Sequence, residues 1–177
     1  MNKVTIRQIH RDQVKLGDYT IGGWVRTYRE SKNVAFIELT DGTTVKGLQV
    51  VIDPSMHSFI ENKERFNTGA AVEIKGKLIA SQGKGQKYDF EANEITVLGD
   101  SSATEYPLQK KGHSLEFLRT ILHLRPRSNT FGAVFRVRSV AAMAIHTFFQ
   151  ERGFYYLTSP IITTADCEGA GQMFRVS

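Results

Sequence analysis

The sequence has a single cysteine, Cys167, so no internal disulfide can form and a multi-cysteine zinc site is excluded. It also has no apolar run near the roughly 18–20 residues of a membrane span. The N-terminal stretch MNKVTIRQIHRDQ lacks the apolar segment of a signal peptide. These absences are typical of a protein of the reducing cytoplasm, and we expect no membrane partner.

The first half of the chain also lacks an excess of positive or negative charge. The net charge of the 177 residues is +5, yet residues 1–100 hold 14 Lys/Arg and 13 Asp/Glu, against 9 and 5 in residues 101–177. Net positive charge alone is weak evidence for a polyanionic partner. A nucleic-acid site within residues 1–100 would therefore be a local patch of cations.

Residues 1–100 have the pattern of a small β-domain. Runs rich in β-branched and aromatic residues predict five strands, at about 18–28, 34–40, 45–52, 70–80 and 86–98. Asp41-Gly42 indicates a turn after the second strand, and residues 54–69 predict a short helix after the third. This is the order of an OB-fold, a five-stranded Greek-key barrel, with another small barrel or an open sheet as the alternative.

The pattern changes after residue 100. GDSSATEYPLQKKG has few apolar residues and is typical of a linker. Ser114 is expected to cap a helix through LEFLRTILHL, and FGAVFRVRSVAAMAIHTFFQERG predicts a long helix with a buried apolar stripe that stops at Gly153. FYYLTSPII then predicts a strand ending at Pro160.

A strand of that composition needs neighbouring strands, which the rest of the chain does not supply. We therefore predict three parts: a complete β-barrel at 1–100, a hinge at 101–113 and the truncated start of a larger domain with helices and strands at 114–177.

The second predicted strand places Phe36 on the face opposite the core. The residues that alternate with it are apolar and should be buried: Ala35, Ile37 and Leu39. Arg29 and Gln49 fall on the neighbouring strands, and strands two and three form the face on which OB-folds bind oligonucleotides. An aromatic ring there can stack on a base, and Arg and Gln can contact its edge. A register shift of one residue would instead put Phe36 in the core.

Lysines lie in the two loops that frame this face. Lys32 follows the first strand, and Lys84 and Lys87 lie in or beside the SQGKGQK loop. They are predicted to bind phosphates, although such lysines can also serve only as solvated surface. The five histidines are scattered, and GKGQK lacks the spacing of a phosphate loop, so we predict no catalytic and no metal-binding residue in this chain.

Four stretches resemble one family. GGWVRTYRESKNVAFIELTDGT resembles the anticodon-binding OB-fold of class II aminoacyl-tRNA synthetases of the aspartyl, asparaginyl and lysyl subgroup. YPLQKKGHSLEFLRTILHLRPRSNTFGAVFRVRS resembles the hinge and catalytic-domain entry of bacterial asparaginyl-tRNA synthetases. GFYYLTSPIIT resembles class II motif 1, and DCEGAGQMF the asparagine-type loop that follows, except that Gln172 stands where the family has glutamate. The resemblance covers nearly the whole chain.

The resemblance implies roles for individual residues in the barrel. The middle anticodon base, a uridine, would stack on Phe36 while Arg29 and Gln49 contact its edges. A glutamate on the fifth strand reads the first anticodon base in this family, which implies Glu91, with Glu94 as the rival.

For the catalytic part, the resemblance implies that Glu168 contacts the ammonium group of the amino acid and that Pro160 lies at a homodimer interface. The parent enzyme would use ATP and Mg²⁺ to form asparaginyl-adenylate and pyrophosphate, and then transfer asparagine to tRNA(Asn). The ATP-binding motifs 2 and 3 would lie beyond Ser177, so this chain alone is expected to be inactive.

Two other functions remain open on the sequence alone. An aspartyl or non-discriminating aspartyl-tRNA synthetase shares the barrel and the middle uridine. A stand-alone OB-fold protein that binds single-stranded nucleic acid would need only residues 1–100.

Overall fold

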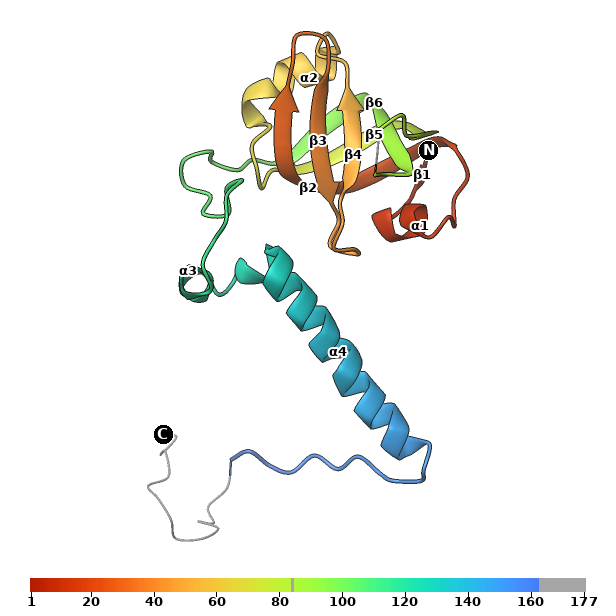
Figure 1. Cartoon of the computed structure of the whole chain (residues 1–177), viewed down its shortest axis with the longest axis vertical. Coiled ribbons are helices and arrows are strands. Elements are labelled where there is room, and N and C mark those ends of the chain that lie inside the picture. The colour runs from red at the N-terminus through yellow and green to blue at the C-terminus, as the bar shows by residue number, and fades with distance from the viewer. Residues whose placement is uncertain (84, 163–177) are drawn as a thin grey trace. The chain divides into compact units, whose positions relative to one another are not determined.

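The computed structural model describes residues 1–83 and 85–162, which form two compact units (Figure 1). The first unit runs from Met1 to Phe135 and the second begins at Arg136. The first unit contains the β-barrel, and the second contains most of a long helix and the segment after it.

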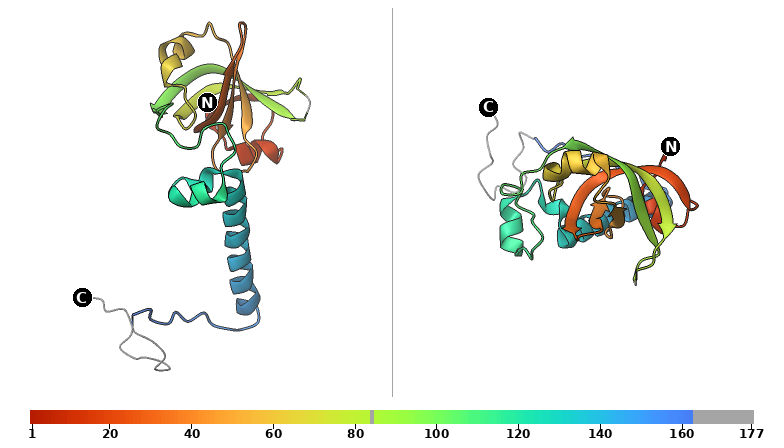
Figure 2. Two further views of the ribbon diagram at one scale, coloured as in Figure 1. Left: turned by 60° about the vertical axis from the view of Figure 1, so that its left-hand side comes forward. Right: turned by 90° about the horizontal axis from the view of Figure 1, so that it is seen from above.

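The barrel is a closed sheet of five strands: β2 (Gly17–Glu30), β3 (Ala35–Thr40), β4 (Leu48–Ile52), β5 (Ala71–Ala80) and β6 (Tyr88–Gly99). The strands are bonded in the order β2-β3-β4-β6-β5, and β5 pairs with β2 to complete the ring. All of these pairs are antiparallel except β4–β6. The predicted OB-fold is confirmed, and Figure 2 shows the strands curling around the core.

A short helix joins β4 to β5, as expected. It comprises α2 (His57–Asn62) and the 3₁₀ turn η1 (Lys63–Arg65). The amide of Ile95 on β6 donates to Ser58 Oγ at 3.1 Å, which holds α2 against that strand.

The alternation in β3 gives the register that the sequence predicts. Ala35, Ile37 and Leu39 are 0%, 1% and 0% exposed, whereas Phe36 is only half-buried on the other face. Where β5 crosses β6, a Cβ on Gly76 would collide with the carbonyl oxygen of Glu91, so this close approach of two backbones requires glycine.

An N-terminal segment that the sequence analysis did not predict covers part of the barrel. It comprises β1 (Asn2–Lys3), which pairs parallel to β2, and α1 (Ile6–His10). Ile6 and Ile9 are buried in the core, and the amide of Ile6 donates to Asp41 Oδ2 at 2.8 Å. Helix α1 has only five residues, too few for a recognisable helical period.

The helix expected after the hinge is shorter than predicted. Ser114 caps it as expected, since its Oγ accepts from the amide of Phe117, but α3 (Leu115–Thr120) ends four residues before residue 124. Leu118 is the one buried residue of α3. The helix therefore gains little stability from burying apolar side chains, and nothing extends it to residue 124. The 3₁₀ turn η2 (Arg125–Arg127) follows, with Pro126 in it.

The long helix is confirmed as α4 (Asn129–Gln150). Gly153 ends it with a φ of 83°, and the amide of Phe154 donates to Phe149 O at 3.1 Å. Two predictions in this region are wrong. The apolar stripe is exposed, with Val137 and Val140 each 70% accessible, and residues 154–162 form no strand.

The reason is the same in both cases: an apolar stripe and a strand need partners to cover or pair with them. None of the helices in the described part of the chain combines the length and apolarity needed to span a bilayer.

Candidate nucleic-acid interface

One row of backbone partners crosses four strands of the barrel. Arg29 on β2 pairs with Phe36 on β3, Phe36 pairs with Val51 on β4, and Val51 pairs with Glu91 on β6. Partnered residues of adjacent strands share a face of the sheet. These four residues, here called the outer row, therefore lie together on the face opposite the core.

At one end of the outer row, Arg29 contacts two other predicted site residues, Phe36 and Gln49. The Arg29 guanidinium lies over the Phe36 ring, with its Cζ 4.9 Å from the ring centroid. Arg29 Nη2 also donates to Gln49 Oε1 at 3.0 Å. The sheet thus brings an aromatic ring, a guanidinium fork and an amide together, which are the groups that stack on an unpaired base and bond its edge.

Sequence reasoning missed Asp89, which contacts one member of this cluster, Gln49. Its side chain is buried, with 6% of the residue exposed. Its carboxylate accepts from Ser81 Oγ at 2.6 Å, from Gln86 Nε2 and, at 3.4 Å, from Gln49 Nε2. Nothing in the sequence pattern marks an aspartate at the start of β6 as buried.

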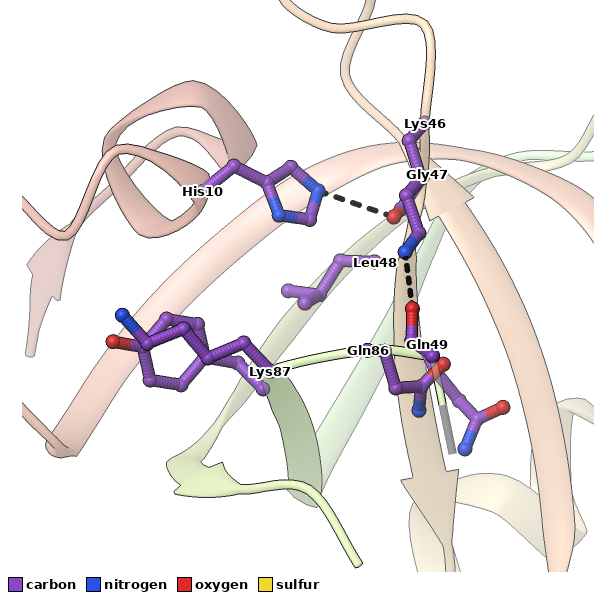
Figure 3. A pocket seen from close by; sticks show the side chains of 9 residues that line it. His10, Lys46, Gly47, Leu48, Gln49, Gln86 and Lys87 are labelled. Atoms are coloured by element: carbon purple, nitrogen blue, oxygen red, sulfur yellow. Dashed lines mark hydrogen bonds between the residues drawn. The ribbon is translucent and has the colours of Figure 1, made fainter. Parts of the chain in front are cut away.

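An open pocket of about 480 Å³ adjoins Gln49 (Figure 3). His10 on α1 points into it and its Nε2 lies 3.2 Å from Gly47 O, while Lys46 Nζ donates to Gly85 O at 2.8 Å. The lining residues come from α1, the loop before β4 and the start of β4, the 81–87 loop and the start of β6: His10, Lys46, Gly47, Leu48, Gln49, Gly85, Gln86, Lys87 and Tyr88. The pocket extends the candidate site beyond the outer row, and its walls carry two lysines.

The predicted phosphate-binding lysines differ in their surroundings. Lys32 is exposed in the β2–β3 loop, and Lys84 lies outside the described residues. Lys87 Nζ binds Asp12 Oδ2 at 2.6 Å, and the Tyr88 hydroxyl donates to Asp12 Oδ1 at 2.7 Å. The hydrogen bond from Lys87 lowers the pKa of Asp12, and the same bond raises the pKa of Lys87. An acidic group therefore offsets the charge of Lys87 at the edge of the pocket.

The two candidate glutamates on β6 are also distinguishable. Glu91 is exposed and belongs to the outer row. Glu94 binds Lys75 Nζ at 3.1 Å through both carboxylate oxygens, on the β5 side of the strand. Glu91 is thus the better placed to meet a ligand that lies on the Phe36 face.

The remaining predicted residues lie outside the barrel. Pro160 is exposed in the second unit, and Glu168 lies outside the described residues. Within residues 1–83 and 85–162, no group of three His, Cys, Asp or Glu side chains is arranged to hold a metal ion.

Comparison with protein families divides the chain between two models. Residues 19–98 match an OB-fold nucleic acid binding domain, and residues 114–177 match class II tRNA synthetases of the D, K and N type. The fold and these matches define part of a class II aminoacyl-tRNA synthetase that carries an OB-fold domain. The match over 114–177 also disfavours a stand-alone OB-fold protein.

Individual relatives show which synthetases of this class the chain most resembles. The chain is 50% identical over 179 aligned residues to asparagine–tRNA ligase of Clostridium tetani, covering 100% of this chain and 38% of that protein. It is 56% identical over 157 residues to asparagine–tRNA ligase of Geobacter metallireducens, covering 89% of this chain and 34% of that protein. The chain belongs to the asparaginyl-tRNA synthetase family and spans little more than a third of these curated relatives.

The fold itself is shared with more distant structures. The chain matches the crystal structure of asparaginyl-tRNA synthetase from Pyrococcus horikoshii complexed with asparaginyl-adenylate, with a TM-score of 0.80 at 20% identity. That match covers 96% of this chain and 39% of that one.

Proposed function

We propose that this chain is the tRNA-recognition part of an asparagine–tRNA ligase, which attaches asparagine to tRNA(Asn) with ATP. Residues 1–100 would be the anticodon-binding domain, residues 101–113 the hinge and residues 114–177 the start of the catalytic domain. The observation that carries the proposal is that Arg29 contacts both Phe36 and Gln49 on the oligonucleotide-binding face of an OB-fold.

The cluster suits a central uridine in an anticodon loop. The exposed part of the Phe36 ring offers a stacking surface, and the Arg29 and Gln49 head groups reach out beside it. Glu91, further along the outer row, would contact the first anticodon base. Lys32 and the lysines of the 81–87 loop, Lys84 and Lys87, would bind phosphates on either side.

In the catalytic part, Glu168 would bind the ammonium group of asparagine, and Pro160 would lie at a homodimer interface. The exposed apolar stripe of α4 supports such an interface, because extended exposed apolar patches mark contact surfaces. Class II synthetases use ATP and Mg²⁺ in general. Within residues 1–83 and 85–162 no group of His, Cys, Asp or Glu side chains is arranged to hold the metal ion, and we assign these residues no step of adenylate formation.

Two measurements test this proposal. The chain should bind an anticodon stem-loop with the asparagine anticodon more tightly than one in which the central U is replaced by C. It should give no asparagine-dependent pyrophosphate exchange by itself. Equal affinity for both loops would refute the proposed recognition, and exchange above background would show that the chemistry needs no residues beyond this chain.

A further inference from the structure

The segment after the barrel has the composition of a linker, yet its first residues are docked on the barrel. Ser101 Oγ donates to Thr68 O at 2.9 Å. Gly69, just before β5, has a φ of 96°, and a Cβ there would lie 2.9 Å from the ring of Tyr106. Real Cβ atoms do not approach a ring so closely, so Tyr106 packs directly on the backbone of the barrel.

The same segment is fastened to the barrel a second time by Arg127 in η2. The Arg127 guanidinium lies over the indole of Trp24 on β2, with Cζ 5.0 Å from the ring centroid. Its Nη1 also donates to the Tyr106 hydroxyl at 3.4 Å. A guanidinium at this distance from an aromatic face is attracted to it. Trp24 is 38% exposed, so its ring lies at the barrel surface, where Arg127 covers part of it.

The other arginine of η2 contacts α4. Arg125 Cζ lies 5.1 Å from the centroid of the Phe131 ring and 5.6 Å from that of Phe135. These two rings stack on each other with centroids 6.0 Å apart. Residues four apart lie on one face of a helix, so a single guanidinium meets both rings. The two arginines of η2 thus bind in two directions, one to the barrel and one to α4.

Little freedom is left between these two contacts. Pro126 has a fixed φ, and Ser128 alone separates η2 from α4. The Ser128 hydroxyl donates to Arg125 O at 2.7 Å and accepts from the amide of Phe131 at 3.3 Å, as a helix cap does. The turn therefore continues into α4 without a flexible residue.

We propose that η2 is a rigid joint between the barrel and the first two turns of α4. Arg127 fastens the turn to the barrel through Trp24, and Arg125 fastens it to α4. All of these residues belong to the first unit, Met1–Phe135. The joint sets the direction in which α4 leaves the barrel, and it depends on no ligand. The experiments below use no RNA, so their failure would leave the proposed function untouched.

The barrel side of the joint is tested through Trp24, the single tryptophan of the sequence. In the full chain, Arg127→Ala uncovers the indole, so acrylamide should quench its fluorescence with a larger quenching constant. Arg127→Lys keeps the charge but not the flat guanidinium, and should fall between Arg127→Ala and the wild type. The amide of Tyr106, which donates to Ser102 O, should exchange with water about two- to fivefold faster in Arg127→Ala, the worth of an exposed cation–π contact.

Arg119→Ala is the matched control for the barrel side. It removes an arginine from the neighbouring helix α3, where Arg119 pairs with Glu116. Both the quenching constant and the exchange rate should stay at their wild-type values. A change in Arg119→Ala as large as that in Arg127→Ala would show a general effect of charge and overturn the proposal. Unchanged values in Arg127→Ala would overturn it as well.

The α4 side is tested by nitrogen-15 relaxation of the full chain. A rigid joint gives the amides of β3 and those of residues 129–135 the same rotational correlation time in the wild type. Arg125→Ala should shorten the time of residues 129–135 and leave the quenching of Trp24 unchanged, while unshifted β3 resonances show that the barrel is folded. Unequal times in the wild type, a comparison that needs no variant, would refute the joint, and so would equal times in Arg125→Ala.

Discussion

Replacing Phe36 with alanine is the most direct test of the candidate site. The ring is half-buried on the outer face, and the Arg29 guanidinium lies 4.9 Å from its centroid. Removing it takes away the stacking surface for a base, which contributes about 1–3 kcal/mol. We therefore expect Phe36→Ala to weaken binding of the anticodon stem-loop by about 5- to 150-fold.

The same substitution should have a small effect on folding. The neighbours of Phe36 on β3 point into the core and are at most 1% exposed, whereas the Phe36 side chain points away from the core and is half-buried. Ile37→Ala is the matched control on the next residue. It should lower the free energy of unfolding by about 2–5 kcal/mol, because it leaves a cavity in the core.

The assay is stem-loop binding by fluorescence anisotropy, with thermal unfolding of both variants measured in the same buffer. Two results would contradict the reasoning. An unchanged dissociation constant for Phe36→Ala would show that no base stacks there. A fall in melting temperature as large as that of Ile37→Ala would show that Phe36 belongs to the core.

Three further predictions concern charge. If the three predicted lysines bind phosphates, log affinity should fall with log salt with a slope of about −2, and a slope near zero would exclude them. Asp12→Asn should tighten stem-loop binding and steepen that slope, because it frees Lys87, and asparagine tolerates the left-handed backbone of φ 56° at this position. Hydrogen bonds from Lys63 and Tyr28 lower the pKa of Glu30 below 4.5, so its stabilising contribution is present above that pH and is lost as the pH falls further. Melting temperatures measured at falling pH should drop less for Glu30→Gln than for the wild type, and parallel curves would rule this contribution out.

How far the sequence predicted the site depended on the regularity of β3. Ala35, Ile37 and Leu39 alternate with polar or half-buried residues, and side chains in a strand alternate strictly between two faces. That period places Phe36 opposite the core without any knowledge of the fold. Antiparallel neighbours then bring Arg29 and Gln49 to the same face, and in the structure Arg29 contacts both Phe36 and Gln49.

Asp89 and Lys87 show what the pattern could not predict. Asp89 is buried because Ser81, Gln86 and Gln49 close around it, and these residues come together only when the β5–β6 loop folds back over β4. Lys87 meets Asp12, 75 positions away in the chain, so its partial neutralisation has no local sequence signal. The short helix α1 was missed because its two buried isoleucines gain their burial from the barrel they cover.

The sequence by itself determined the positions of the five strands along the chain, the face of Phe36, the cap at Ser114 and the end of α4 near Gly153, because each depends on neighbours within a few positions along the chain. The tertiary structure decided the rest. It set the row that joins Arg29 to Glu91, the hydrogen bond from Arg29 to Gln49 and the pairing of Lys87 with Asp12, because contacts between distant segments exist only after the barrel has closed. It also left the apolar stripe of α4 uncovered, since local periodicity predicts which side chains share a face but not what will cover them.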